Sequence, residues 1–366
     1  MRITKKKIIS SLVSIVTTLS LSYGVANADL VLKKDGSKVY NYYLDKEDKD
    51  SVTVKNGKGE ELRIPRSEIK DYVTTKQDID EETALLIQEL KSFEDWGETK
   101  LGVPKSDNYL AYDKNFETLH ILLYCKEMEL PKTYFELNYE QLESEEKAEA
   151  RKAELESQGY EVYYRTAESV ANDSTISQDL LDADLFREIF VIFHENSHDL
   201  TDLPIDIDEA AASIAGYYGA LEYFKEKFGE NSQEYKEAAK RVDQWYKNDE
   251  LVIKCYEKIE QVYNSSLSKE EKIEQRDQLL EDLRRQQCFL FQTLIPGTNT
   301  PGLVSDVTYS RYGPLAKKVY EKAGSVKEAV KVFKNLSYML KYQKHMYDED
   351  YIRSYCKKYL EDYLNS

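Results

Sequence analysis

Two of the four histidines in this 366-residue chain stand four positions apart in the segment VIFHENSHDL, and a glutamate directly follows the first. On a helix, residues i and i+4 share one face about 6 Å apart, so His194 and His198 can present imidazole nitrogens to one metal ion. The spacing HExxH is typical of zinc sites in which the glutamate, here Glu195, acts as a general base without binding the metal. The segment therefore predicts a catalytic Zn²⁺ site.

A catalytic zinc ion needs three protein ligands and one open position. The downstream segment DIDEAAASIAGYYGA carries small residues that let one helix approach another closely, and Glu209 lies at the start of that face. We therefore expect Glu209 to be the third ligand, with Asp206 as its rival in the preceding loop. Asp208 is expected to be the N-cap of the helix. The alternative explanation of Glu209 is a first-turn acid that the helix dipole favours.

The alternative to a metal site is a surface helix that carries two histidines by chance, because short motifs also match at random. The flanking residues favour a buried helix, since residues 190–193 are apolar and Asn196 and Ser197 are uncharged. A charged carboxylate such as that of Asp199 is compatible with a buried helix only if it orients a neighbouring group.

Helical periodicity dominates the elements that must position these residues. Beyond residue 179, helices are expected at 180–200, 208–228, in a charged pair between 232 and 294 that breaks near 265–268, and at 326–364, with a loop at 295–306. Before residue 179, we expect an amphipathic helix from residue 78, a strand at 119–128, a charged helix at 139–157 and a strand in YEVYYRT.

Residues 29–75 show strand patterns that are interrupted by the turn pairs Asp35-Gly36 and Asn56-Gly57. The pattern KDG…SVTV…IPRSEI resembles the small Sm-like or SH3-like β modules of exported bacterial proteins. The expected fold class is therefore α+β, with a small all-β, barrel-like module at 29–75 followed by a mainly α-helical domain at 76–366.

The first 28 residues have the composition of a signal peptide. Four basic residues precede the uncharged stretch 8–25, which ends in Ala26-Asn27-Ala28, a small-x-small cleavage pattern. We expect removal of residues 1–28 and a periplasmic or secreted protein. No other segment is apolar for long enough to span a membrane, so no transmembrane segment is expected in the mature chain.

The charge and the cysteines exclude other classes of site. A net charge of −17 repels phosphate backbones, so we expect no nucleic-acid partner. The four cysteines form no CxxC pair, which disfavours a thiolate zinc site. Disulfides and free buried thiols are equally open for Cys125, Cys255, Cys288 and Cys356.

Several landmarks follow one another in the order found in a known family. They are LGVPKSDNYLAY, SQGYEVYYR, AESVANDSTISQDLL, REIFVIFHENSH, DEAAASIAGYYGA, SSLSKEEKIEQRDQLLEDLR and NTPGLVSDVTYSRYGPLAKKVYEKAG. Across residues 83–336 the chain resembles the predicted zinc aminopeptidases of bacteria, a gluzincin-like family. The resemblance implies a zincin-like metallopeptidase domain with Zn²⁺ on His194, His198 and Glu209, and Glu195 as general base.

The same resemblance draws attention to Asn299 and to the pair Thr308-Tyr309, which match a late Asn and Thr-Tyr pair in the family. A phenol near a zinc site can donate a hydrogen bond to the oxyanion, so Tyr309 is the expected donor. The chain departs from the family in a slightly shorter segment before Glu209 and in Asp208, which replaces the usual Asn. These departures leave the placement of the third ligand open.

The resulting hypothesis is an exported zinc-dependent peptidase, aminopeptidase-like, that hydrolyses peptide or protein substrates. An aminopeptidase must also hold the free amine of its substrate with acidic groups, and the sequence does not identify them, so exopeptidase and endopeptidase activity are both open. The alternative is a catalytically inactive exported binding protein on the same metallopeptidase scaffold.

Overall fold

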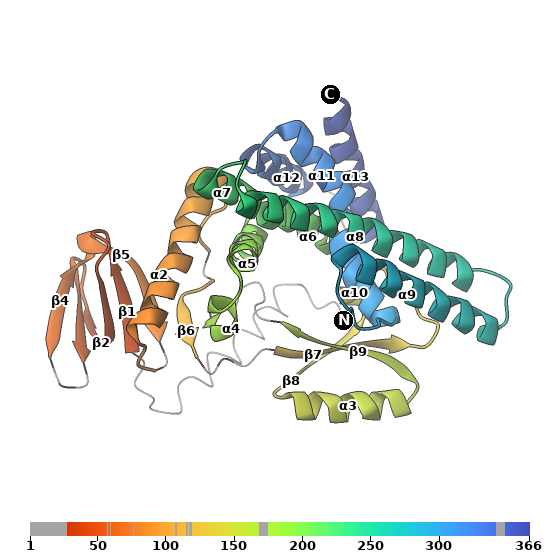
Figure 1. The fold of residues 1–366 in the computed structure, drawn as a ribbon, viewed down its shortest axis with the longest axis horizontal. Helices are drawn as coiled ribbons and strands as arrows, with labels where there is room; N and C mark the ends of the chain where they lie inside the picture. Colours follow the sequence, from red (N-terminus) through yellow and green to blue (C-terminus); the bar gives the residue numbers. More distant parts are fainter. Residues whose placement is uncertain are drawn as a thin grey trace. The chain divides into compact units, whose positions relative to one another are not determined.

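The computed structural model describes residues 28–366 apart from 57, 59, 76, 107, 115, 117–118, 168–174 and 342–347. The expected signal peptide lies outside the described residues, except for Ala28. The described chain is α+β, with a strand-rich N-terminal region and a mostly helical remainder, as the sequence predicts (Figure 1). It divides into two compact units: the described residues of 28–85 with those of 110–114, and the described residues of 86–109 with those of 115–366.

The first unit is a sheet of consecutive antiparallel hairpins to which one parallel strand is added. Within this unit the strands are hydrogen-bonded in the order β6-β5-β1-β2-β3-β4, and β6 is the parallel strand. The strand bounds are β1 Ala28–Lys33, β2 Lys38–Glu47, β3 Ser51–Asn56, β4 Glu61–Pro65, β5 Ile69–Thr75 and β6 Ala111–Asp113.

The predicted turn at Asp35-Gly36 is confirmed, and it joins β1 to β2. Gly36 adopts a φ of 84°, a conformation that costs glycine little, and the Asp35 carboxylate accepts a hydrogen bond from the Ser37 backbone at 2.9 Å. The alternation in SVTV places Val52 and Val54 together in the core of the first unit. Local turn chemistry and period-two patterning therefore build this sheet.

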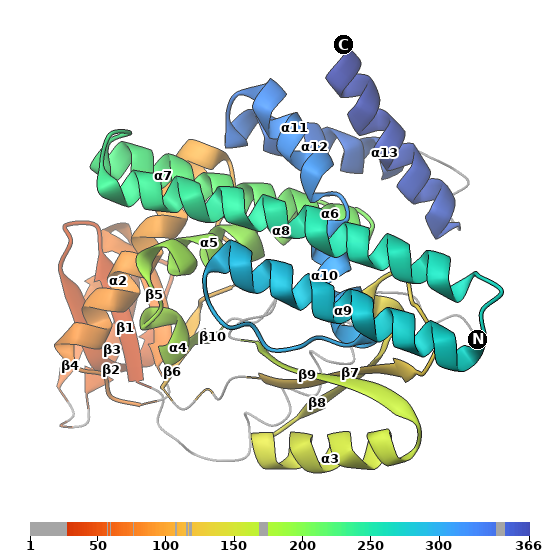
Figure 2. The same ribbon diagram turned by 45° about the vertical axis from the view of Figure 1, so that its right-hand side comes forward.

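The second unit contains a three-stranded antiparallel sheet with helices on both faces. The strands lie in the order β8-β7-β9, with bounds β7 Leu119–Lys126, β8 Asn138–Leu142 and β9 Tyr160–Ala167. Successive side chains of β7 point to opposite faces of the sheet. Leu122 packs with helix α3 (Glu145–Ser157), and Leu123 packs with the larger helical core. Figures 1 and 2 show α3 along one face and α9 and α10 over the other.

Helices make up most of the rest of the second unit, and the boundary between the units falls inside α2. The bounds are α2 Glu81–Trp96, the π-turn η2 Gly97–Leu101, α4 Gln178–Leu181, α5 Leu185–Ser197, the 3₁₀ turn η4 His198–Leu200, α6 Ile205–Ser213, the π-turn η5 Ile214–Tyr218, α7 Gly219–Phe228, α8 Gln233–Tyr263, α9 Lys269–Phe291, α10 Thr300–Ser310, α11 Gly313–Ala323, α12 Val326–Lys341 and α13 Glu349–Asn365. Short elements are η1 Arg66–Glu68, η3 Tyr134–Glu136 and β10 Thr175–Ser177.

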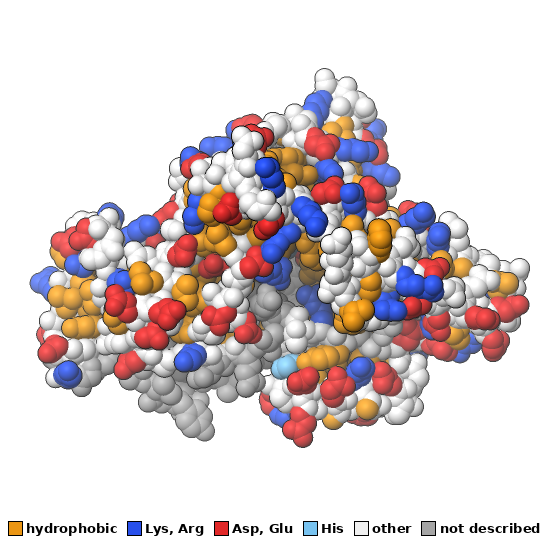
Figure 3. Space-filling view, in the orientation of Figure 1, with side chains coloured by type: hydrophobic (Ala, Val, Ile, Leu, Met, Phe, Trp, Pro, Cys, Tyr) orange, Lys and Arg blue, Asp and Glu red, His pale blue; other side chains and the backbone are white. Residues whose placement is uncertain are grey.

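The predicted charged helix pair is confirmed as α8 and α9, which break at residues 264–268. Ser268 and Glu271 form a capping box that starts α9, and this satisfies backbone N–H groups at the helix N-terminus. Figure 3 shows acidic and basic side chains interspersed over this hairpin, in agreement with ion pairs such as Arg284–Glu281 at 2.7 Å. The hairpin is thus stabilised by its capping box and by apolar contacts on its inner face.

Three element predictions are wrong. The helix expected at 180–200 is divided into α4 and α5, with Asp184 as the N-cap of α5. Residues 138–142 form β8 rather than the start of a charged helix, because Tyr139 pairs with Leu123 of β7, and the helix begins only after the N-cap Ser144. The expected loop at 295–306 ends at Asn299, whose side chain caps α10 by accepting from the Gly302 backbone at 3.1 Å. An Asn-Thr-Pro sequence suits a turn, but it equally suits a helix start with proline in the first turn.

All four cysteines are free thiols: Cys125, Cys255 and Cys356 are buried and Cys288 is half-buried. Burial raises the pKa of each buried thiol to about 12. Among the described residues, no helix has the length and apolar character needed to cross a membrane.

Candidate metal centre

Helix α5, which carries His194 and Glu195, is largely buried. The Asp184 side chain caps its N-terminus by accepting from the Arg187 backbone at 3.3 Å. Most of the helix is buried, including His194, Asn196 and Ser197, as the uncharged flanks of the motif predict. The α-helix ends at Ser197, so His198 opens the 3₁₀ turn η4.

Close packing places α5 against the segment that follows Glu209. A methyl group built on Gly216 would lie 2.7 Å from the Phe190 ring and 3.0 Å from its backbone oxygen, and one built on Gly219 would lie 2.8 Å from the Phe193 ring. The expectation that small residues allow two helices to approach closely is confirmed. This contact holds α6 and η5 beside α5, which brings Glu209 to the histidines.

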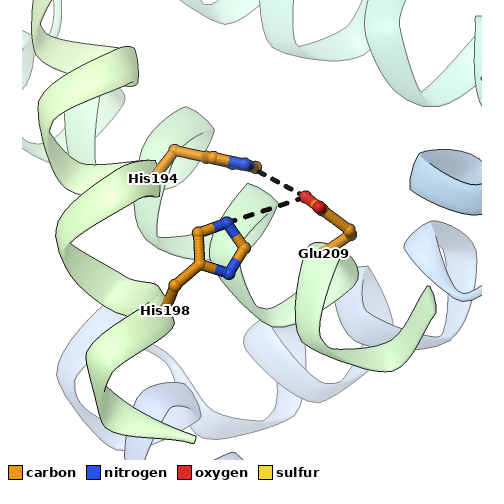
Figure 4. A group of neighbouring side chains, drawn as sticks. All are labelled: His194, His198 and Glu209. Atoms are coloured by element: carbon orange, nitrogen blue, oxygen red, sulfur yellow. Dashed lines mark ion pairs between the residues drawn. The ribbon is translucent and has the colours of Figure 1, made fainter. Parts of the chain in front are cut away.

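His194, His198 and Glu209 converge on one point, as Figure 4 shows. The Glu209 Oε2 atom lies 3.1 Å from His194 Nε2 and 3.8 Å from His198 Nε2, and one ligand atom from each residue lies within 4.8 Å of the other two. Ligand atoms of a tetrahedral zinc ion with bonds of 2.0–2.1 Å are separated by roughly 3.3 Å. The two distances from Glu209 Oε2 lie near that value.

Burial of the Glu209 carboxylate also fits a cation. Its side chain is 5% exposed, and the Oε2 atom has no hydrogen-bond partner. A buried carboxylate oxygen without a donor is costly unless a positive charge lies beside it. Two imidazoles and one carboxylate are the same kinds of donor group as those in catalytic zinc sites with three protein ligands.

Asp208 holds the second histidine in place. Its Oδ2 atom lies 2.8 Å from His198 Nδ1, while Thr201 donates to its other oxygen. A hydrogen bond at Nδ1 leaves Nε2 of His198 free to face Glu209. Burial lowers the pKa of His198, but the carboxylates of Asp208 and Glu209 outweigh that effect and raise it to about 9.

The expectation that Asp208 is the N-cap of this helix is therefore wrong. Helix α6 begins at Ile205 after Pro204, so Asp208 falls inside its first turn and binds a side chain instead. The orienting role expected for a carboxylate beside the motif belongs to Asp208. Asp199 is exposed in η4.

The rival ligand Asp206 lies elsewhere. It is in the first turn of α6 rather than in a loop, it is 1% exposed, and its Oδ2 lies 3.2 Å from Arg353 Nε and 3.8 Å from Arg311 Nε. Both arginines lower its pKa, but burial dominates and raises it. Asp206 thus ties α6 to the C-terminal helices, and Glu209 is the acid that joins the two histidines.

Glu195 and Tyr309 lie close enough that the charge of Glu195 affects the pKa of the Tyr309 phenol. Glu195 is half-buried on α5, and Tyr309 is on α10 with its ring stacked on Tyr134 at 6.2 Å between centroids. Burial, Glu209 and Glu195 raise the pKa of Tyr309 well above its ordinary value, although Arg165 lowers it. Tyr309 is therefore a phenol that keeps its proton and can donate it in a hydrogen bond.

Asn299 and Thr308 have structural partners. The Asn299 amide caps α10 and also donates to the Val162 carbonyl at 2.8 Å. Thr308 Oγ1 accepts from the Tyr134 backbone at 2.9 Å, which fixes Tyr134 beside Tyr309. These contacts give both residues a role in positioning α10 against the sheet.

Tyr134 and Arg165 are residues near the site that the sequence does not reveal. Arg165 lies on β9 and is hydrogen-bonded to Tyr309, and the phenol of Tyr134 lies close enough to Glu209 and Glu195 that both raise its pKa. Neither residue belongs to a motif. The one available signal is a single cation in the aromatic strand YEVYYRT.

A buried polar network fixes α5 from its other side. Asn196 donates to Glu94 at 3.1 Å and accepts from Ser106 at 2.5 Å, and Lys91 pairs with Glu94 at 2.7 Å with both side chains at most 3% exposed. Because these groups satisfy one another, Asn196 can be buried without cost to the motif helix.

Comparison of the chain with protein-family models, with curated proteins and with solved structures finds no match.

Proposed function

We propose that the protein is an exported zinc-dependent peptidase whose second unit is a zincin-like metallopeptidase domain. The observation that supports this most directly is the convergence of ligand atoms from His194, His198 and Glu209 within 4.8 Å of one another. Two neutral imidazoles and one carboxylate are the donor set that zinc peptidases use, with a fourth position left for substrate or water. A zinc ion held by these residues would polarise a carbonyl group and would lower the pKa of water.

The remaining steps fall to side chains of this chain. Glu195, beside the first ligand on the same helix, accepts the proton of the attacking water and transfers it to the leaving amine. Tyr309 donates a hydrogen bond to the carbonyl oxygen as that oxygen becomes negative. Asp208 keeps Nε2 of His198 facing Glu209. The imidazole ring therefore needs no reorientation when a metal binds.

Metal content and one variant test the proposal. Purified protein never exposed to chelator is expected to contain about one zinc ion per chain, and Glu195→Gln is expected to keep the zinc while peptide hydrolysis falls by a factor of 10² or more. Elemental analysis and a fluorogenic peptide assay measure the two quantities. Absence of stoichiometric zinc from such a preparation contradicts the proposal.

Two further variants separate the rival ligands. Glu209→Ala is expected to strip the zinc, whereas Asp206→Asn should keep it and lose stability instead, since Asp206 pairs with Arg353 and Arg311. Zinc retained by Glu209→Ala and lost by Asp206→Asn would reverse the assignment. A panel of peptides with free and acetylated N-termini decides the aminopeptidase question, because equal cleavage of both rules that activity out.

A further inference from the structure

Arg165 combines partial burial with an incomplete set of partners. It lies on β9 and is half-buried. Its Nη1 atom donates to Ser305 Oγ at 3.3 Å, and it shares a hydrogen bond with Tyr309. A guanidinium has five N–H donors, so these two contacts leave most of its donors unused.

No carboxylate oxygen in the described part of the chain lies within 4.0 Å of the Arg165 guanidinium. Other shielded arginines of the same unit are paired directly: Arg353 reaches Asp206 at 3.2 Å, and Arg276 pairs with Glu161. The negative charge of Asp306 raises the pKa of Arg165, but its carboxylate lies more than 4.0 Å from the guanidinium. A partly desolvated cation without a close counterion favours an added anion.

The Arg165 side chain is partly accessible to solvent. Among the described residues, none of its nitrogens is both fully buried and without a partner, so any nitrogen that makes no hydrogen bond is reached by solvent. Helix α10 links this guanidinium to the candidate metal centre, since α10 carries Ser305, the partner of Arg165, and packs against both β9 and α6, the helix that carries Glu209.

We propose that Arg165 binds a carboxylate group of the substrate beside the metal centre, and that Ser305 and Tyr309 fix the guanidinium for that contact. The proposal rests on the proposed peptidase activity and names its substrate class: peptides with a negative charge close to the bond that is cleaved. The carboxylate is either the C-terminus of a short peptide or the side chain of Asp or Glu. Planar pairing of guanidinium and carboxylate through two hydrogen bonds gives such a contact direction as well as strength.

The test compares four peptides that differ only at the C-terminal residue: Asn and Asp, each as free acid and as amide. Each peptide is prepared with a free and with an acetylated N-terminus, so that exopeptidase and endopeptidase activity are both detected. Wild-type protein is expected to cleave at least one charged form with kcat/KM roughly ten- to hundredfold above the Asn amide, mainly through a lower KM. Preference for the free acid over the amide identifies the C-terminus as the carboxylate. Preference for the Asp amide over the Asn amide identifies a side chain.

Arg165→Gln is expected to reduce the preference to less than about threefold, and Arg165→Lys to retain part of it, because a single ammonium keeps the charge without the bidentate geometry. Arg151→Gln is the matched control, since that arginine pairs with Glu140 on the far face of the sheet and should leave the preference unchanged. Zinc content and thermal unfolding confirm that each variant is folded. Equal cleavage of all four peptides by wild type, or a full preference in Arg165→Gln, overturns the proposal.

A binding measurement separates this proposal from the proposed function. In the Glu195→Gln background, calorimetric titration with the same peptides reports the carboxylate contact without turnover. If no peptide is hydrolysed by zinc-loaded wild type but the charged peptides still bind roughly tenfold more tightly, the peptidase assignment fails and the Arg165 site stands. If hydrolysis proceeds but binding ignores the charge, only the Arg165 site fails.

Discussion

His198 sits between two carboxylates, and this couples metal binding to a proton. Because Asp208 and Glu209 raise the pKa of His198 to about 9, the imidazole carries a proton at neutral pH when no metal is bound. A zinc ion must displace that proton, so the apparent zinc affinity is expected to rise about tenfold per pH unit between pH 7.5 and 8.5. Competition with a chelating dye at several pH values measures this slope.

Variants of the neighbouring acids check the cause. Asp208→Asn removes the carboxylate on Nδ1, so the slope should flatten and the affinity at pH 8.5 should fall by roughly 10- to 100-fold. Asp199→Asn, at an exposed position in the turn that follows, should change neither quantity. An unchanged slope in Asp208→Asn would show that another group carries the proton.

The residues of the candidate site differ in how far the sequence predicts them. His194, Glu195 and His198 follow from their spacing, and Glu209 follows from its place at the start of the small-residue face of the next helix. The sequence predicts the wrong role for Asp208 because aspartate is favoured both as an N-cap and as a hydrogen-bond acceptor for a histidine that binds a metal. Arg165 and Tyr134 come from a distant strand and a short 3₁₀ turn, so only the tertiary fold brings them to the site.

At the scale of elements, the contact between α5 and η5 decides the position of Glu209. Gly216→Ala places a methyl group 2.7 Å from the Phe190 ring, so we expect a loss of about 1–3 kcal/mol in the free energy of unfolding together with weaker zinc binding. Urea unfolding and zinc titration measure the two effects.

Gly297→Ala provides the control for that substitution. Its added methyl group would meet only Arg284 at 3.9 Å, an ordinary contact, so stability and zinc affinity should stay within about 0.5 kcal/mol of wild type. If both variants behave alike, the close approach at Gly216 does not position the ligand.

The sequence predicts an element correctly where local patterns determine its conformation without help from tertiary contacts. The hairpin at Asp35-Gly36, the strand β7 and the pair α8 and α9 follow from turn residues and periodicity. β8 was missed because its five residues gain their conformation from pairing with β7, a contact that no local pattern encodes. The start of α10 was missed because Asn299 and Pro301 suit a turn and a helix N-terminus equally well.

At the scale of the whole molecule, we propose that the protein acts outside the cytoplasm. Cleavage after Ala28 would leave Asp29 as the first residue of the mature chain. Intact-mass measurement and N-terminal sequencing of protein recovered from the periplasm or medium are expected to find Asp29, whereas Ala26→Arg should leave residues 1–28 attached. Recovery of wild-type protein there with Met1 still in place contradicts the proposal.

All three candidate ligands come from one helical hairpin, formed by α5, the turn η4 and α6, so they are neighbours in the chain as well as in space. Bringing them together closes only a short loop, and the conformational entropy lost in that step is small compared with a site assembled from distant segments. Contacts of low sequence separation also form early in folding. We therefore expect the hairpin to capture its metal ion before the sheet and the C-terminal helices pack, so that the ion acts as a nucleus for folding as well as a centre for chemistry.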